Sequence, residues 1–265
     1  MDLPPLSPFP FGTNSCQSKP FRWSNDGQLS SEQQAALNVG AHGWYDPGLY
    51  CDRLDAEGRE PAYFRNGLEE FWGVTDAVSA RKIVGRLLDG MHSSGFEVVA
   101  PLVDAVVSKK ADHDSADHRE FLAARQGLCG QATVGTLAEY DTLLNLRTMN
   151  VLRPAIASDF FPSHIRAWDL ARAAGVARYS HAAGYLDTDE TWAMLTAALS
   201  SARSYYANWR QFGHGFLIGR AYWKSFSSLK EATEFATGMG NLINHLLVSA
   251  SSPWRRQPLA ADSVR

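Results

Sequence analysis

The sequence predicts an all-α protein, a compact multi-helix bundle with an irregular N-terminal arm and a short C-terminal tail. Apolar residues recur three and four positions apart over most of the chain, which is the spacing of one helix face. No hairpin turn such as Asn-Gly lies between alternating apolar residues, so no strand pair is expected. Pro, Ser, Gly and Asn are concentrated at the start of the chain, where regular structure is not expected.

The two ends of the chain differ in composition from its middle. Residues 1–28 are expected to form the irregular arm. We expect isolated aromatic side chains to hold this arm against the rest of the protein: Phe9, Phe11, Phe21 and Trp23. Residues 29–250 are expected to form a single helical domain, and residues 251–265 a flexible tail beyond the last helix.

The first two strong helical stripes follow one another closely. Apolar and small residues between Ala77 and Met91 share one helix face, with Thr75 as the expected start and a glycine at position 90 or 95 as the expected end. Residues 99–106 have the same three-and-four spacing. The pattern therefore predicts two successive helices.

Longer stripes occupy the C-terminal half of the chain. Residues 192–209 form a near-perfect heptad seam, preceded by Asp187 and Glu190 at the spacing of a capping pair. Residues 232–246 form another stripe, which a serine at position 228 is expected to open. Segments 167–186 and 209–226 are also helical in pattern, but they carry arginines among small and aromatic residues.

Composition and charge exclude several classes of protein. The chain has 45% hydrophobic and 20% charged residues, which is typical of a globular protein. Its formal net charge of −3 provides no basic field for a nucleic-acid backbone. The N-terminus does not resemble a signal peptide, and no run of about 18 apolar residues could span a membrane. Cys16, Cys51 and Cys129 form no CxxC pair, so we expect a cytoplasmic protein with reduced thiols.

Two arginines are predicted to point inward from their helices. With Trp168 at zero and about 100° per residue, Arg172 lies at about 40°, inside the apolar stripe of its segment. With Phe216 at zero, Arg220 lies within the aromatic face of its own segment. A buried guanidinium is costly unless a carboxylate and hydrogen bonds compensate it. Asp169 precedes Arg172 by three residues, so we expect this carboxylate to neutralise the inward arginines.

Two interpretations of this Asp–Arg–Trp set are compatible with the sequence. In the first, it is a structural network that locks helices in register. In the second, its surplus positive charge binds an anionic small molecule or a partner's carboxylate, because a guanidinium fork suits bidentate anion recognition. The candidate residues for either role are Asp169, Arg172, Arg178, Arg220, Trp168, Trp209 and Trp223.

Other motifs give weaker signals. Gly213, Gly215 and Gly219 faintly resemble a dinucleotide fingerprint, but the preceding segment is helical in pattern, so no cofactor is expected. The GxxxG spacing of the last two glycines instead predicts close approach of another helix. Residues 109–120 concentrate histidine and acidic side chains, a mixture more typical of a solvated loop and a helix cap at position 114 or 115 than of a metal site. We therefore expect no metal and identify no catalytic residue.

Five sequence features follow one another along the chain: WGxxD, WDxxRxxxxxR, an acidic helix start, a central tryptophan and GRxxW. In this order they resemble the bacterial domain-of-unknown-function family 1266. The matching residues are Trp72, Gly73, Asp76, Trp168, Asp169, Arg172, Arg178, Gly184, Glu190, Trp192, Trp209, Gly219, Arg220 and Trp223. Thr191 departs from the Glu-Ala-Trp that is common in the family. The resemblance spans residues 30–226 and implies a small helical bacterial protein, with no catalytic residues to transfer.

Two functions are expected, from different classes. The first is a non-catalytic bacterial protein-interaction module with a protein partner, such as an immunity or accessory protein linked to interbacterial toxin delivery. The alternative is an enzyme or sensor that binds an anionic small molecule through the inward arginines. The first is favoured because the sequence offers no nucleophile–base pair, metal ligand set or cofactor motif.

Overall fold

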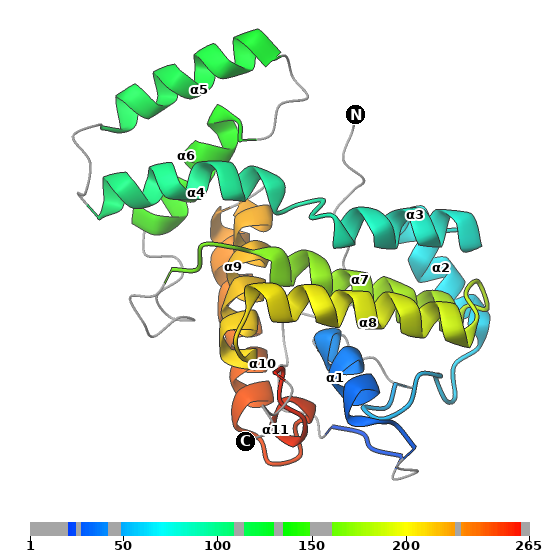
Figure 1. Ribbon diagram of the computed structural model, residues 1–265. Coiled ribbons are helices and arrows are strands. Elements are labelled where there is room, and N and C mark those ends of the chain that lie inside the picture. Colours follow the sequence, from blue (N-terminus) through cyan, green and yellow to red (C-terminus); the bar gives the residue numbers. More distant parts are fainter. Residues whose placement is uncertain are drawn as a thin grey trace. The chain divides into compact units, whose positions relative to one another are not determined.

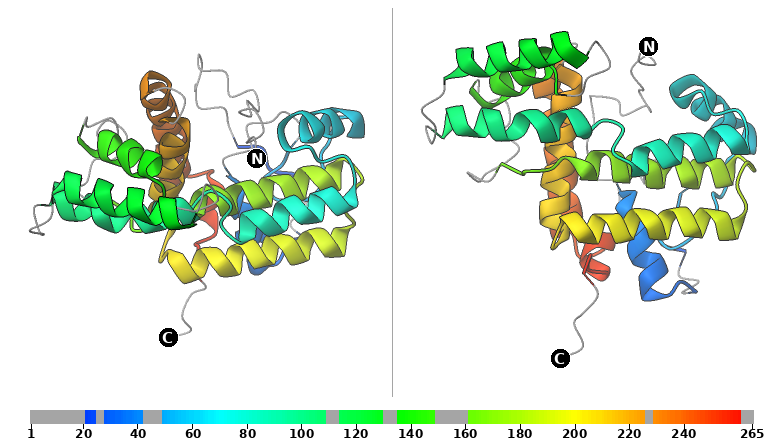
Figure 2. Two further views of the ribbon diagram at one scale, coloured as in Figure 1. Left: turned by 90° about the horizontal axis from the view of Figure 1, so that it is seen from above. Right: turned by 45° about the horizontal axis from the view of Figure 1, so that its top comes forward.

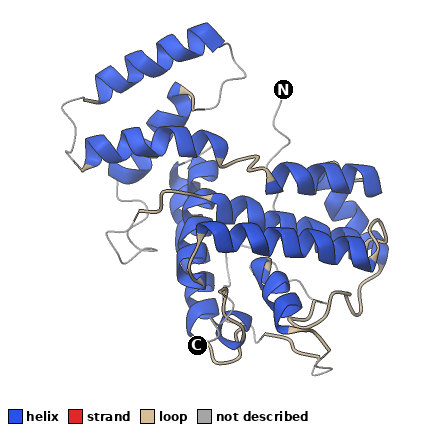
Figure 3. Cartoon of the chain, in the orientation of Figure 1, coloured by secondary structure: helices blue, strands red, loops and turns tan. Residues whose placement is uncertain are grey.

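A computed structural model describes residues 21–24, 28–41, 49–108, 114–129, 135–148, 161–225 and 229–260. The helices in these ranges (Figure 1) are α1 (Ser31–Val39), α2 (Pro61–Trp72), α3 (Ala77–Leu88), α4 (Ser94–Val107), α5 (Ser115–Cys129), α6 (Leu137–Thr148), α7 (Arg166–Ala182), α8 (Thr188–Tyr205), α9 (Trp209–Ser225), α10 (Leu229–Val248) and α11 (Pro253–Arg256). Extended pairing in these ranges is limited to an isolated bridge between Leu49 and Ala56 (Figure 3). The predicted all-α fold class is confirmed. Among these helices, none is both long and apolar enough to cross a membrane.

Side-chain caps fix where helices begin. At the start of α8, the Asp187 carboxylate accepts a hydrogen bond from the backbone N–H of Glu190 at 2.8 Å, as the capping pair predicts. The start of α3 was predicted one residue too early: Asp76, not Thr75, is the N-cap, and it accepts from the N–H of Ser79 at 2.7 Å. An aspartate is favoured here because its negative charge also interacts with the helix dipole. Hydrogen bonds from the backbone and hydroxyl of Ser79 lower the pKa of Asp76.

The heptad seam predicted over residues 192–209 is divided between two helices. α8 ends at Tyr205, and Tyr206 adopts an extended backbone with φ −134° and ψ 128°. Asn208 then starts α9, because its side-chain oxygen accepts a hydrogen bond from the N–H of Gln211 at 3.0 Å. The prediction of one helix through Trp209 was therefore wrong at its end.

The chain divides into two compact units by its internal contacts. Unit 1 comprises the described parts of residues 1–89, 169–212 and 242–265, and unit 2 those of residues 90–168 and 213–241. One boundary falls between α3 and α4, and the other three fall within α7, α9 and α10. The arm, single domain and tail, with limits expected at residues 28 and 250, stay predictions.

Unit 1 is organised around α8, which contacts α1 and α3. α7 runs beside α8 in each view (Figures 1 and 2). Gly40, at the C-terminus of α1, lies so close to α7 that an added Cβ would be 3.3 Å from the Cβ of Ala174. Leu37, Leu195 and Leu199 are almost fully buried. Aliphatic side chains from α1 and α8 thus form a close-packed core with the small residues of α7.

The segment after α10 is anchored in unit 1. Trp254 of α11 stacks on Trp209, with ring centroids 5.1 Å apart and ring planes 1° apart. Its indole N–H donates to the backbone oxygen of Asn38 at 2.9 Å, and the Asn38 amide donates to the oxygen of Pro253 at 2.8 Å. Trp254 and Leu259 are buried. Part of the stretch expected as a tail is therefore held by stacking and hydrogen bonds.

Two aromatic side chains of the N-terminal arm also contact unit 1. Phe21 stacks on His245 with ring centroids 4.8 Å apart. The indole N–H of Trp23 donates to the backbone oxygen of Ser251 at 2.9 Å. These contacts have the anchoring role predicted for the arm's aromatic residues. The other two, at positions 9 and 11, lie outside the described residues.

Unit 2 contains α4, α5 and α6, and α6 packs on α4. Phe96 of α4 is fully buried, and its ring lies 5.4 Å from that of Tyr222 in an edge-to-face arrangement. α5 contacts both α4 and α6. His118 and Leu122 on one side of α5 are buried, so this helix packs against the unit by a single face.

Candidate functional site

Arg178 of α7 is buried in unit 1 and donates hydrogen bonds to backbone carbonyl oxygens. The residue is 3% exposed. Its Nη2 donates to the oxygens of Tyr50 and Arg53 at 2.7 and 2.6 Å. Its Nε donates to the oxygen of Leu54 at 3.2 Å. These charge-assisted bonds hold the segment at residues 50–54 against α7.

A small cavity adjoins Arg178 in unit 1. Its lining includes Leu37, Ala174, Tyr179 and Leu195, and its volume is about 10 Å³. A single water molecule needs roughly 10–15 Å³ by the same measure, and pockets for drug-sized ligands are larger by more than an order of magnitude. This cavity is therefore too small for a nucleotide or an acidic metabolite.

Asp169 and Arg172 lie on the part of α7 that belongs to unit 1. Asp169 is fully buried, whereas Arg172 is half-buried. The guanidinium carbon of Arg172 lies 4.4 Å from the ring centre of Trp72, which is a cation–π distance. Trp72 was not among the candidate site residues, although its WGxxD motif distinguished it. The ion pair expected between Asp169 and Arg172 stays a prediction.

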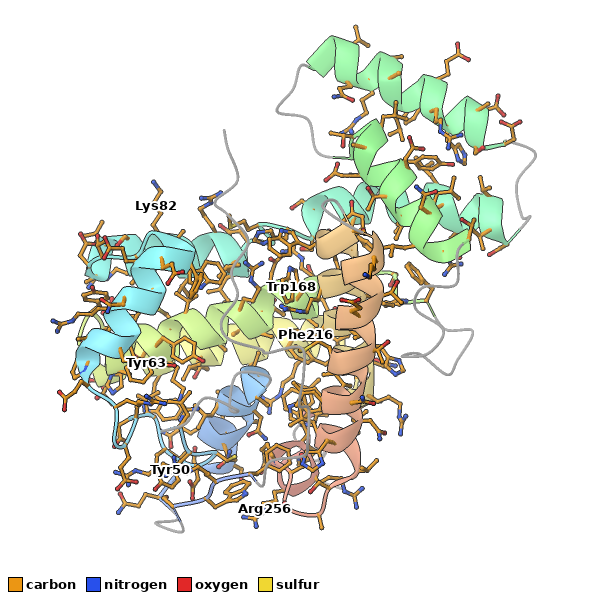
Figure 4. The ribbon with its side chains drawn as sticks, turned by 180° about the vertical axis from the view of Figure 1, so that it is seen from behind. Tyr50, Tyr63, Lys82, Trp168, Phe216 and Arg256 are labelled. Carbon is orange, nitrogen blue, oxygen red and sulfur yellow. The ribbon has the colours of Figure 1, made fainter. Side chains whose placement is uncertain are left out.

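Unit 2 has its own arginine–tryptophan cluster, formed by α9 and the first turn of α7. The guanidinium carbon of Arg220 lies 5.5 Å from the ring centre of Trp168. The Trp168 ring is 5.3 Å from that of Phe216, with both residues labelled in Figure 4, and 6.0 Å from that of Trp223. Burial lowers the pKa of Arg220 to about 10, so its guanidinium is still charged at neutral pH. The structure thus places this cation over the ring of Trp168, which in turn contacts the rings of Phe216 and Trp223.

Gly219 allows α9 to approach the start of α7 within unit 2. A Cβ added at Gly219 would lie 2.5 Å from the Cβ of Trp168 and 3.2 Å from the Cβ of Ile165. Carbon atoms in proteins do not approach this closely without a backbone shift. The close approach predicted from the GxxxG spacing is therefore confirmed at Gly219.

The candidate site residues belong to both units. Asp169, Arg172, Arg178 and Trp209 lie in unit 1, and Trp168, Arg220 and Trp223 lie in unit 2. Within unit 2 the structure brings its three members together. Within unit 1, Trp209 supports the C-terminal segment, because its indole N–H donates to the oxygen of Gln257 at 2.8 Å. The role of the whole set, either as a structural network or as a binding site, stays a prediction.

The acidic and histidine-rich stretch at residues 109–120 begins outside the described residues, which resume at Asp114. Asp114 caps α5 by accepting hydrogen bonds from the N–H groups of Ala116 and Asp117 at 2.6 and 3.1 Å. The Nδ1 of His118 lies 3.2 Å from the hydroxyl oxygen of Tyr140. In the part of the chain that the structure describes, no group of three His, Cys, Asp or Glu side chains could hold a metal ion. The cap predicted at position 114 or 115 is confirmed at Asp114.

Cys51 lies in the segment held by Arg178 and is buried. Burial raises the pKa of its thiol to about 12, so almost no thiolate forms near neutral pH. Because the thiolate is the reactive species, we expect iodoacetamide at pH 8 to leave Cys51 unmodified in the folded protein and to modify it in urea. Peptide mass spectrometry resolves this residue from the other cysteines. Rapid alkylation of Cys51 without urea would contradict its placement.

α5 carries a second apolar surface on the side away from its buried face. On a helical projection, Asp117, Glu120, Phe121, Ala124 and Leu128 fall within about 100° of one another. All five residues are exposed, and Phe121 and Leu128 are 58% and 88% exposed. We call these five residues the α5 outer face. This face was not predicted from the sequence, because its apolar side chains are few and are mixed with acids.

Comparisons with known proteins give a family and one partial relative, both without a described activity. A family model described as "Protein of unknown function (DUF1266)" matches residues 67–259. The chain is 37% identical over 62 residues to "Uncharacterized protein YbeR" of Escherichia coli (strain K12). That stretch covers 23% of this chain and 26% of the relative, so the chain spans about a quarter of the relative's length. No solved structure matches the chain.

Proposed function

The chain belongs to the DUF1266 family of proteins of unknown function, and we propose that it acts there as a non-catalytic protein-interaction module. The observation that carries this proposal is the α5 outer face, where Phe121 and Leu128 share one exposed helix stripe. Apolar side chains gathered on a surface mark interaction sites more often than isolated ones do. The mild net charge of −3 is compatible with a protein partner.

The arginines support this proposal over the binding of an anionic metabolite. Arg178 already donates to carbonyl oxygens of its own unit, and the adjoining cavity has room for about one water molecule. Arg172 and Arg220 lie over the rings of Trp72 and Trp168. Guanidinium groups held in this way stabilise packing. We therefore propose that these arginines lock the fold of their units.

The finer role that we propose is that of a cytoplasmic immunity or accessory protein linked to toxin delivery between bacteria. We expect co-expression with the products of neighbouring genes to yield a stable complex, detected by co-purification and light scattering. Where a neighbour is toxic, co-expression should restore growth. Measurable turnover of a small molecule without any stable protein complex would contradict the proposal.

A thermal-shift screen with nucleotides and acidic metabolites separates the two functions. A ligand present at 100 times its dissociation constant adds about 2.7 kcal/mol to the free energy of unfolding. We expect no such stabilisation, because the guanidinium groups are engaged within the protein. A shift that Arg220→Lys abolishes, while the variant keeps its helical circular dichroism, would favour the metabolite-binding alternative.

A further inference from the structure

The α5 outer face differs from the other exposed apolar side chains of the described chain. Val78 on α3 and Val248 on α10 are 69% and 62% exposed, and each is on a separate helix. Phe121 and Leu128 are seven residues apart on α5, which places them about 20° apart around its axis. Two large apolar side chains at heptad spacing form the ridge with which one helix packs against another.

The residues beside this ridge leave room for a second helix. Ala124 lies between Phe121 and Leu128 on the same face. Small side chains beside a ridge form the groove that receives side chains of a neighbouring helix, at interaxial distances of about 8–10 Å. The shape of the outer face therefore suits an α-helix.

The charges on α5 indicate what such a helix carries. Among its described side chains the exposed charged residues are Asp117 and Glu120, both acidic, and the capping residue Asp114 is also exposed. The two arginines are half-buried, and Arg119 binds the carboxylate of Asp141 on α6 at 2.8 Å. An acidic surface beside an apolar ridge is complementary to a helix with basic side chains.

The same charges disfavour a second copy of this chain as the occupant. In a parallel pair of α5 helices, the acids at positions 117 and 120 would face their own copies. In an antiparallel pair centred between Phe121 and Leu128, Glu120 would face the C-terminal end of the other helix. That end carries the negative pole of the helix dipole, so both pairings are repulsive.

We infer that the α5 outer face binds an amphipathic helix of a partner protein, whose apolar ridge is flanked by lysine or arginine side chains. This inference rests on the interaction role proposed above and names its surface and the chemistry of its partner. The ridge of Phe121 and Leu128 supplies apolar contact area, and the acid at position 120 favours a basic partner over an acidic one.

Two synthetic helical peptides test this inference with the full-length protein. Both have leucine at heptad positions a and d, and they carry either lysine or glutamate at e and g. Fluorescence anisotropy measures their binding. We expect the lysine peptide to bind at least about tenfold more tightly than the glutamate peptide, with a preference that weakens as salt is added. Equal binding of both peptides would overturn the inference.

Single substitutions test whether peptide binding depends on the α5 outer face. Leu128→Ser should weaken the lysine peptide's affinity by at least about tenfold without changing the helical content, because the leucine side chain is exposed. Glu120→Lys should abolish the preference for lysine over glutamate. The matched control is Val78→Ser, another exposed aliphatic side chain, which should change neither affinity. Unchanged binding by Leu128→Ser would overturn the assignment.

Two further outcomes separate this inference from the proposed function. If a co-expressed partner binds wild-type protein and Leu128→Ser equally, the α5 outer face is not its binding surface. The proposed function as a protein-interaction module would still hold. If the wild-type protein self-associates in sedimentation experiments and Leu128→Ser abolishes this, the α5 outer face binds a second copy of the chain. That result would overturn the inference that it binds a basic helix of a partner protein. Peptide binding without any partner in co-expression would contradict the proposed function alone.

Discussion

Arg178→Ala is expected to lower the free energy of unfolding by about 3–5 kcal/mol, because it removes three charge-assisted hydrogen bonds to backbone carbonyl groups. The wild-type guanidinium reaches the oxygens of Tyr50, Arg53 and Leu54 within 3.2 Å. Native domains are stable by only about 5–15 kcal/mol, so this loss is a large fraction of the total. Urea unfolding followed by circular dichroism measures it.

Two variants show whether the guanidinium itself is responsible. Arg178→Lys keeps the charge but replaces the planar fork by a single ammonium group, so we expect a loss between those of wild type and Arg178→Ala. Arg86→Ala removes an exposed arginine from α3 and should change stability by less than about 0.5 kcal/mol. If Arg178→Ala were as stable as Arg86→Ala, the hydrogen bonds of Arg178 would contribute little.

The same variant also tests local opening. Cys51 lies between two of the carbonyl groups that Arg178 binds, and its own N–H donates to the oxygen of Arg22 at 2.8 Å. We expect Arg178→Ala to make Cys51 reactive toward iodoacetamide under conditions in which α7 and α8 remain helical. Such reactivity would show that the arginine holds this segment in place as well as stabilising the whole unit.

Local sequence patterns predicted the features that depend on neighbouring residues. The helices were predicted because apolar spacing and capping residues act within one or two turns, as at Asp187 and Asp114. The close approach at Gly219 was predicted for the same reason, since it requires only that a residue without a side chain faces inward. The break after Tyr205 was missed because the apolar spacing continues across it.

Features that depend on distant segments could not be predicted in this way. Only Arg172 and Arg220 were predicted to point inward from their helices, but Arg178 is 3% exposed because the segment around Tyr50 covers it. That segment is more than 100 residues away, and no spacing within α7 relates to it. Trp72, which lies beneath Arg172, was missed as a site residue for the same reason.

The α5 outer face was missed for a different physical reason. The stretch before it is rich in acids and histidine, which favoured a solvated loop. Exposure is also not encoded by residue type: Leu122 and Leu128 are both leucines of α5, yet one is 1% and the other 88% exposed. Only the packing of α5 against α4 and α6 distinguishes its two apolar sides.

Gly219→Ala is expected to lower the free energy of unfolding by about 1–3 kcal/mol, because the new methyl group has no room. Its Cβ would lie 2.5 Å from the Cβ of Trp168 and 3.2 Å from that of Ile165. These atoms are attached directly to the backbone, so a change of side-chain rotamer cannot move them away. α9 and the start of α7 must therefore separate, which should also alter the fluorescence of the buried Trp168.

Gly85→Ala is the matched control, since it makes the same change within α3, where an added Cβ meets nothing within 4 Å. Alanine is favoured over glycine inside a helix by about 0.5–1 kcal/mol, so this variant should be more stable than wild type. The two substitutions have the same effect on the unfolded chain and on helix propensity, so their difference in urea midpoint isolates the steric cost at Gly219. If Gly219→Ala were more stable than wild type, α9 and Trp168 would be farther apart than in the structure. That result would contradict the contact between Arg220 and the Trp168 ring.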